Sequence, residues 1–253
     1  MSGNAPPTRG PDYASHFAAV APRYDALREE ATDEVVGWIG EALRLAGGEA
    51  LLDVGCGTGA TTAALARRFD LDAVGLDRSP EMLAAAVAQR CDRCRIVEGE
   101  AERLPFADGA FDRVLMQTMV HLVRRPAAFA QARRVLRRGG ALTVLTVDPA
   151  GAEHFWLANW FPSYPSIEHA RFPTAATLSD ELRAAAFEAV DVARRDRVLR
   201  FTRDRALAML RARFASSFAV MDDAEFHAGL ARAEREMPDA FTATLRLLLL
   251  TAS

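Results

Sequence analysis

Residues 51–59 read Leu-Leu-Asp-Val-Gly-Cys-Gly-Thr-Gly, an apolar run that leads into three glycines at alternate positions. The apolar run predicts a buried β-strand. The glycines let the backbone turn tightly and approach a ligand, because no Cβ stands in the way. A helix is predicted to open at Thr58, with its free N–H groups directed into the same gap. The stretch therefore predicts a nucleotide-type ligand at the end of a first strand.

The rest of the chain alternates between strand-like and helix-like segments. Strand-like runs occupy residues 50–54, 71–76, 95–98, 113–117 and 141–147, and Ala- and Leu-rich helical stretches separate them. This alternation predicts an α/β fold, a Rossmann-like doubly wound sheet with mostly parallel strands and helices on both faces. Beyond these segments we expect a helix at 177–186, strands at 188–201 and 242–251, and two amphipathic helices within 203–235.

The glycines alone leave two classes of cofactor open. Gly55, Gly57 and Ala60 also satisfy the dinucleotide fingerprint, and Asp77 lies 22 residues after Gly55, where that fold keeps its ribose-binding acid. An NAD(P)-dependent oxidoreductase is therefore one alternative. The chain contains 31 arginines and no lysine. The Tyr-x-x-x-Lys pair that would support the oxidoreductase alternative therefore cannot exist.

Four further motifs follow the glycine loop in a fixed order. They are Val-Gly-Leu-Asp-Arg-Ser-Pro-Glu-Met-Leu at 74–83, Glu-Gly-Glu-Ala-Glu-Arg-Leu-Pro-Phe at 98–106, Phe-Asp-Arg-Val-Leu at 111–115 and Arg-Val-Leu-Arg-Arg-Gly-Gly at 134–140. Over residues 46–148 the chain thereby resembles the class I S-adenosylmethionine-dependent methyltransferases, in particular the small-molecule type 11 group. The resemblance implies a last strand inserted antiparallel beside the sixth. The oxidoreductase alternative leaves Glu100-Ala101 and the Arg138-Gly139-Gly140 turn without a purpose.

The resemblance also implies a role for polar groups near the strand ends. Asp53 and the backbone of Gly55–Gly59 would hold the methionine end of S-adenosylmethionine, which Gln117 would border. Asp77 would accept hydrogen bonds from both ribose hydroxyls. The residues by themselves also allow Asp77 to be only a helix cap before Ser79-Pro80.

The adenine end of the cofactor has its own implied contacts. Met82 would lie against the ring, the Glu100 carboxylate would reach the amino group, and the Ala101 N–H would meet a ring nitrogen. Met82 fits equally well as a core side chain, and Glu100 as a solvated carboxylate. The whole implied cofactor-binding set is Tyr24, Asp53, Gly55, Cys56, Gly57, Gly59, Asp77, Arg78, Met82, Glu100, Ala101 and Gln117.

Length and composition favour one domain over residues 1–253, because 50% hydrophobic residues suffice for a full core. We expect an N-terminal helical lid at 13–45 that carries Tyr24, and a cofactor-binding core at 46–148. An aromatic lid insertion at 149–175 and C-terminal strands at 176–253, with a helical insertion at 203–235, complete the expected organisation.

Aromatic residues concentrate in the segment 149–173. They are expected to cover the methyl donor and to wall the acceptor pocket, although a lid that merely packs on the sheet is the simpler interpretation. The predicted substrate-binding residues are Tyr13, His16, Phe155, Trp156, Trp160 and Tyr164.

Methyl transfer is an in-line displacement, so the protein must align the acceptor, exclude water and, for a hydroxyl, accept a proton. His121 follows the fourth predicted strand and is the predicted catalytic base. Asp148 lacks partner carboxylates, so no magnesium site is expected. Cys91 and Cys94 are interpreted as ordinary residues at a helix end, without a metal or a disulfide framework.

Composition also limits the partners. The net charge of −3 argues against a nucleic-acid partner, and the chain shows neither an apolar signal core nor a bilayer-length apolar run. We therefore expect a cytoplasmic monomer or homodimer. It would transfer a methyl group from S-adenosylmethionine, leaving S-adenosylhomocysteine, to the O, N or C atom of a small molecule of secondary metabolism. A cyclase or a binding module that holds the cofactor without transferring its methyl group stays open.

Overall fold

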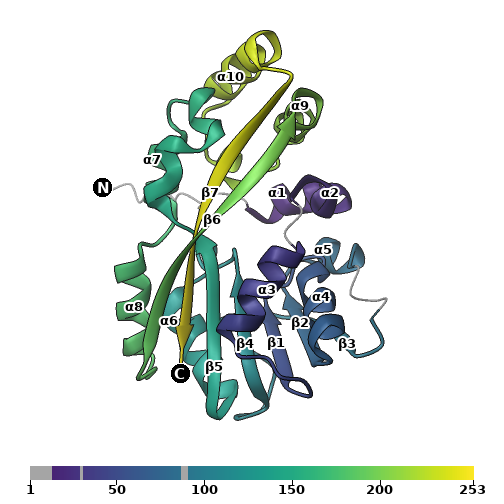
Figure 1. Ribbon diagram of the computed structural model, residues 1–253, viewed down its shortest axis with the longest axis vertical. Helices are drawn as coiled ribbons and strands as arrows, with labels where there is room; N and C mark the ends of the chain where they lie inside the picture. Colours follow the sequence, from purple (N-terminus) through teal and green to yellow (C-terminus); the bar gives the residue numbers. More distant parts are fainter. Residues whose placement is uncertain (1–12, 29–30, 87–90) are drawn as a thin grey trace, which may run out of the picture.

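The computed structural model describes residues 13–28, 31–86 and 91–253. A seven-stranded sheet in the order β3-β2-β1-β4-β5-β7-β6 forms its centre (Figure 1). The strands are β1 (Ala50–Val54), β2 (Asp72–Asp77), β3 (Cys94–Glu98), β4 (Phe111–Gln117), β5 (Leu136–Val147), β6 (Val190–Thr202) and β7 (Ala240–Ala252). Strands β1 to β5 are parallel, and β7 lies antiparallel between β5 and β6. The predicted sheet with an antiparallel last strand is confirmed.

Helices cover both faces of the sheet. Around it lie α3 (Asp33–Ala42), α4 (Ala60–Phe69), α5 (Pro80–Ala84), α6 (Arg125–Val135) and α8 (Ala175–Ala184). Alternate side chains of β1 point to opposite faces, so Leu52 and Val54 pack with α6 and α8, while Leu51 packs with α3 and α4. The chain order reverses between β1 and β4, and such a switch point leaves a crevice at the strand ends.

The strands β6 and β7 continue together beyond the end of β5. Leu247 pairs with Val147 at the last position of β5, whereas Ala240 to Arg246 pair only with β6. Figure 1 shows this ribbon rising above the sheet with helices packed along it. We call residues 149–173 and 197–246 the cap.

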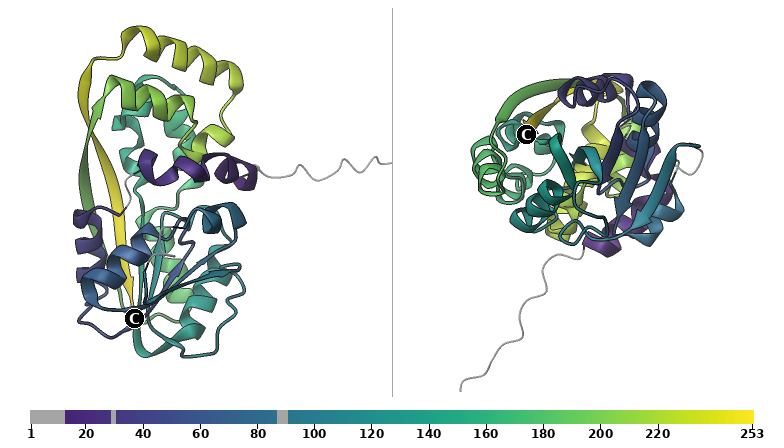
Figure 2. Two further views of the ribbon diagram at one scale, coloured as in Figure 1. Left: turned by 90° about the vertical axis from the view of Figure 1, so that its right-hand side faces the viewer. Right: turned by 90° about the horizontal axis from the view of Figure 1, so that it is seen from below.

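The helices of the cap come from two separate parts of the chain. They are η3 (Pro149–His154), η4 (Trp156–Asn159) and α7 (Tyr164–Arg171), then α9 (Arg203–Arg211), η5 (Ser216–Ala219) and α10 (Asp223–Glu236). Their aromatic side chains and the ribbon share one hydrophobic core. The N-terminal α1 (Tyr13–Val20), η1 (Ala21–Arg23) and α2 (Tyr24–Arg28) lie between cap and sheet, where α1 contacts α5 and η5 (Figure 2).

Three sequence expectations need correction. The helix after the glycine loop begins at Ala60 rather than Thr58, because Gly59 takes a left-handed conformation (φ 71°) and serves as the N-cap. Strand β5 begins five residues before the predicted Ala141. Cys91 and Cys94 are not ordinary residues at a helix end: they form a disulfide, since a tight turn brings their Cα atoms within 5.2 Å.

The helices in the described parts of the chain are all too short or too polar to cross a membrane.

Candidate active site

The glycine loop follows β1 and turns at the edge of the crevice. Gly55 and Gly57 have φ values of 73° and 56°, in the left-handed region that favours glycine. A Cβ on Gly55 would lie 2.9 Å from the Met119 side chain, whereas a Cβ on Gly57 would meet no described atom within 4 Å. The loop is therefore packed against the protein at Gly55 and open at Gly57.

Asp77 ends β2 beside this loop. Its Oδ2 accepts a hydrogen bond from the Gly57 N–H at 2.8 Å, and its Oδ1 accepts one from the Ser79 N–H at 2.9 Å. Ser79, not Asp77, caps α5 by accepting from the Met82 N–H. Each Asp77 oxygen keeps a lone pair for another donor. The carboxylate is thus fixed in place and still able to bind two hydroxyl groups.

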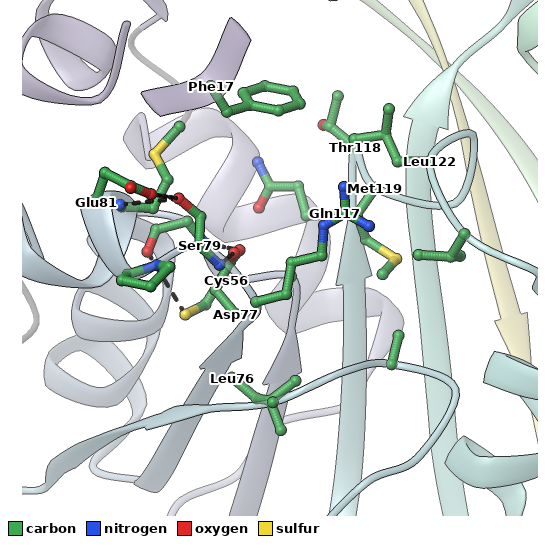
Figure 3. A pocket seen from close by; sticks show the side chains of 18 of the residues that line it. Phe17, Cys56, Leu76, Asp77, Ser79, Glu81, Gln117, Thr118, Met119 and Leu122 are labelled. Carbon is green, nitrogen blue, oxygen red and sulfur yellow. Dashed lines mark hydrogen bonds between the residues drawn. The ribbon is translucent and has the colours of Figure 1, made fainter. Parts of the chain in front are cut away.

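A cavity of about 380 Å³ lies above these strand ends. The predicted cofactor-binding residues that line it are Tyr24, Gly55, Cys56, Gly57, Asp77, Arg78, Met82, Ala101 and Gln117. Figure 3 shows Phe17 of α1 above the cavity, with Asp77, Ser79 and Glu81 on one side and Thr118, Met119 and Leu122 on the other.

Three predicted residues fall outside the described lining of this cavity. Asp53 is buried under the loop, where its Oδ2 accepts from the Thr62 hydroxyl at 2.6 Å. Gly59 is the N-cap of α4. Glu100 is exposed, whereas Glu102 lines the cavity and accepts from the Arg124 N–H at 2.8 Å.

The N-terminal helices contribute the roof of the cavity, and sequence reasoning predicted Tyr24 there but missed two neighbouring residues. Phe17 and Ala18 of α1 line it together with Tyr24. The Thr58 hydroxyl donates to Asp25 at 2.5 Å and so ties the glycine loop to α2. The aromatic and small residues around the Tyr24-Asp25 pair were the available indication, but they do not reveal which side chains face inward.

Cys56 also lines the cavity, yet its chemistry is that of a neutral thiol. Burial, together with the charges of Asp53 and Asp77, raises the pKa of the Cys56 thiol far above its usual range. The thiolate is the nucleophilic form, so Cys56 is not a nucleophile at neutral pH. Within residues 13–28, 31–86 and 91–253, no group of three or more His, Cys, Asp or Glu residues could hold a metal ion.

Gln117 and Thr118 stand at the end of β4 and line a second cavity as well as the first. Thr118 has a φ of 52°, which is rare for a β-branched residue and typical of strained positions at functional sites. The Gln117 Oε1 atom is buried and has no hydrogen-bond partner among the described residues. This acceptor can therefore receive a hydrogen bond from water or from a ligand in the cavities that Gln117 borders.

The second cavity, of about 100 Å³, lies between the cap and the sheet. Of the predicted substrate-binding residues, Phe155, Trp156 and Tyr164 line it. Trp160 lies outside the described lining of both cavities, with the Arg232 guanidinium 5.6 Å from its ring centre.

Tyr13 and His16 lie in α1, beside the cavities. The Tyr13 hydroxyl accepts a hydrogen bond from the Arg171 Nε at 3.0 Å. His16 makes an edge-on ring contact with Phe17, at 5.3 Å between centres.

His121 does not belong to the described lining of either cavity. Its ring stacks on Phe172 at 4.0 Å between centres, and Phe172 lines the second cavity. The predicted base therefore contacts a residue that lines the second cavity and does not itself belong to the described lining.

Two curated relatives are similar to much of the chain. Residues 52–144 match a family model described as a methyltransferase domain. The O-methyltransferase cnsE of Penicillium expansum is 33% identical over 181 residues, which are 66% of this chain and 64% of that protein. A malonyl-[acyl-carrier protein] O-methyltransferase of Herminiimonas arsenicoxydans is 30% identical over 71% of this chain and 70% of its own length. The chain thus spans less than two thirds of cnsE.

Solved structures share the fold at lower sequence identity. A protein assigned to the methyltransferases of an antibiotic biosynthesis pathway in Anabaena variabilis has a TM-score of 0.70 at 21% identity, over 88% of this chain and 98% of that one. The [4+2]-cyclase SpnF has a TM-score of 0.65 at 22% identity, over 100% and 99% of the two chains. At these identities the likeness concerns the fold alone.

Proposed function

Because the chain belongs to the class I S-adenosylmethionine-dependent methyltransferases, we propose that it transfers the methyl group of S-adenosylmethionine to an oxygen atom of a small molecule. The observation that carries this proposal is the Asp77 carboxylate, held between the Gly57 and Ser79 N–H groups at the mouth of the glycine loop. The choice of oxygen rests on the two O-methyltransferase relatives.

The residues around the larger cavity suit this cofactor. Asp77 has lone pairs for two ribose hydroxyls, the open side of Gly57 leaves room for close approach, and Met82 and Phe17 supply apolar surface for a base. When bound, S-adenosylmethionine supplies an electrophilic methyl group on a positively charged sulfur.

Methyl transfer also requires that the acceptor be aligned, that water be excluded and that a proton be removed, and we assign these tasks to side chains in and near the two cavities. Gln117 and Thr118 would hold the acceptor oxygen in line with the methyl group, because they border both spaces. Phe17, Ala18 and Tyr24 would keep water from the methyl group. His121 would take the hydroxyl proton, and its place behind Phe172 implies that a water molecule relays it.

Calorimetry with S-adenosylhomocysteine and with NAD tests the cofactor. We expect S-adenosylhomocysteine to bind and NAD not to bind, and preferential binding of NAD would overturn the proposal. A screen of metabolite extracts with labelled methyl donor then tests transfer. Label in a product extract supports methyl transfer, whereas binding without any S-adenosylhomocysteine formation would favour the non-methylating cyclase or binding module.

A further inference from the structure

We propose that Arg171 is a positioning residue that ties the roof of the larger cavity to the cap, so that a ligand bound beneath the roof also stabilises α7 and η5 beside the second cavity. The roof consists of the N-terminal helices α1 and α2, which supply Phe17, Ala18 and Tyr24. This role rests on the proposed function, because it takes the larger cavity as the place where the cofactor binds.

The Arg171 side chain, at the end of α7, is 9% exposed and joins α1 to two parts of the cap. Its Nε donates to the Tyr13 hydroxyl of α1 at 3.0 Å, and its Nη2 donates to the Ser216 hydroxyl of η5 at 2.8 Å. Its Nη1 pairs with Glu168, one turn earlier in α7, at 3.3 Å. A guanidinium presents its donors in a fixed plane, so these bonds hold α1, α7 and η5 in one arrangement.

The surroundings of Arg171 belong to the second cavity. Its guanidinium carbon lies 5.1 Å from the ring centre of Tyr13 and 5.6 Å from that of Phe172. Such contacts with aromatic faces add to the hydrogen bonds in keeping the cation in place. Phe172, Glu168 and Ser216 all line the second cavity. A shift of Arg171 would therefore disturb the cap side of that cavity.

Helix α1 connects Arg171 to the larger cavity. Tyr13 is the first residue of α1, and Phe17, one turn later on the same side of the helix, lines the larger cavity. Figure 3 shows the Phe17 ring above that cavity. The helix contacts η5 in the cap and α5 beside the sheet. Because residues one turn apart in a helix move together, we expect Phe17 to leave the cavity only if Tyr13 also shifts relative to Arg171.

The roof is held separately on its sheet side. Ala21, which follows α1 and is 3% exposed, shares a small buried cluster with Met82 of α5. The Thr58 hydroxyl of the glycine loop donates to Asp25 of α2. These contacts do not involve Arg171. Loss of the Arg171 side chain should therefore release the roof from the cap and leave its attachment to the sheet in place.

This arrangement predicts that the two cavities are coupled. A ligand that touches Phe17 binds the closed roof better than an open one, so it shifts the population toward the closed roof. The closed roof keeps the Tyr13 hydroxyl on Arg171, which in turn holds Ser216 and Glu168. Filling the larger cavity should therefore make the last turn of α7 and η5 open less often, although neither contributes to the described lining of that cavity.

Amide exchange with and without saturating S-adenosylhomocysteine tests the coupling. In the parent protein the ligand should slow exchange about threefold or more in α1, in the last turn of α7 and in η5. In Arg171→Met it should still slow exchange in the glycine loop, but exchange in α7 and η5 should no longer respond to the ligand. A purely structural role would instead change exchange in α7 and η5 by the same factor in both conditions. Arg183→Met is the matched control, because Arg183 is 57% exposed in α8, and it should behave like the parent.

Tyr13→Phe is a milder variant that keeps the ring and removes only the hydroxyl that accepts from Arg171. Labelled S-adenosylhomocysteine, chased with excess unlabelled ligand, should dissociate about threefold faster from Tyr13→Phe and about tenfold faster from Arg171→Met, because the roof opens more often. The association rate should change by less than about twofold in both variants, since the sheet side of the site stays in place.

If Arg171→Met fails to fold, the exchange pattern of the parent and the dissociation rate of Tyr13→Phe decide. The proposed role would be overturned if S-adenosylhomocysteine binds the parent without slowing exchange in α7 and η5, or if both variants keep the parental dissociation rate. Absence of S-adenosylhomocysteine binding by the parent would instead overturn the proposed function.

Discussion

The sheet and the cap build their cavities in different ways. At the sheet, the larger cavity is lined by a contiguous stretch of the glycine loop, Gly55 to Gly57, together with Asp77 at the end of β2 and Ala101. The second cavity, between the cap and the sheet, is lined by residues from separate segments, among them α3, η4, α7, β6 and the residues around η5. A contiguous loop imposes its geometry locally, whereas the cap depends on packing between distant segments.

This difference implies a division of roles. A cavity formed by backbone groups depends little on side-chain identity, so it suits a ligand that many related proteins share. A cavity of side chains can change its ligand through single substitutions. The four predictions below test whether the two regions are separable in catalysis, stability, binding and pH dependence.

His121 sits on the boundary between the two regions, and its removal should have the largest effect. His121→Ala should lower turnover by roughly 10²- to 10⁴-fold, the usual contribution of a positioned base. The affinity for S-adenosylhomocysteine should stay within a factor of about three, because His121 lies outside the described lining of the larger cavity. Initial rates with an identified acceptor and calorimetry measure the two effects. His169→Ala, at an exposed histidine of α7 beside Glu153, is the control. Near-parental turnover would leave alignment alone as the catalytic mechanism.

The same contrast explains what sequence could predict. The fold and the glycine loop were predictable, because strand periodicity and a short glycine motif act through neighbouring residues. The lining of the second cavity by Thr118, Glu168 and Arg197 was not predictable, because it depends on the β6–β7 extension and on α7 folding over the sheet. The Cys91–Cys94 disulfide was missed because a count of three cysteines excludes a framework but not a local turn.

Two fully buried phenylalanines test whether the cap is a separate unit of stability. Phe129 lies in the core beneath the sheet, and Phe161 packs in the cap against Phe218 and Phe226, with ring centres 5.1 and 5.8 Å away. Replacing either by Ala should cost about 3 to 5 kcal/mol of local or global stability. Amide exchange should accelerate only in the cap for Phe161→Ala and throughout the protein for Phe129→Ala. Equal acceleration of the sheet strands by Phe161→Ala would show that the two regions unfold together.

Asp77 tests the sheet side alone. Asp77→Ala should weaken S-adenosylhomocysteine binding by about 2 to 4 kcal/mol, since two hydrogen bonds to an ionised acceptor are lost. This corresponds to an affinity loss of roughly 30- to 900-fold by calorimetry. Asp72→Ala, at the exposed start of the same strand, should leave the affinity unchanged. Unchanged affinity in Asp77→Ala would remove the central contact of the proposed cofactor site.

Asp112 lies at the start of β4, at the far end from both cavities, and should affect stability without affecting binding. Its carboxylate accepts a hydrogen bond from the Ala50 N–H at 2.9 Å and pairs with Arg137 at 2.7 Å. Burial raises the pKa of Asp112, but the hydrogen bond from Ala50 and the Arg137 guanidinium outweigh it, so the pKa lies below its usual value. A lowered folded-state pKa means that the ionised carboxylate stabilises the protein above the unfolded-state pKa of about 4, and that this stabilisation is lost as the pH falls through the folded-state value.

Asp112→Asn should therefore lower the free energy of unfolding by about 1 to 2 kcal/mol at pH 7, an amount kept small because Arg137 is half exposed. Denaturant titrations of parent and variant at pH 7, 5, 4 and 3 measure the difference, which should shrink below about pH 4 as the parent carboxylate takes up its proton. Affinity for S-adenosylhomocysteine at pH 7 should be the same in both proteins. A stability difference that stays constant down to pH 3 would mean that the carboxylate's charge contributes nothing at this end of the sheet, and weakened binding would mean that the far end of the sheet is coupled to the cofactor cavity.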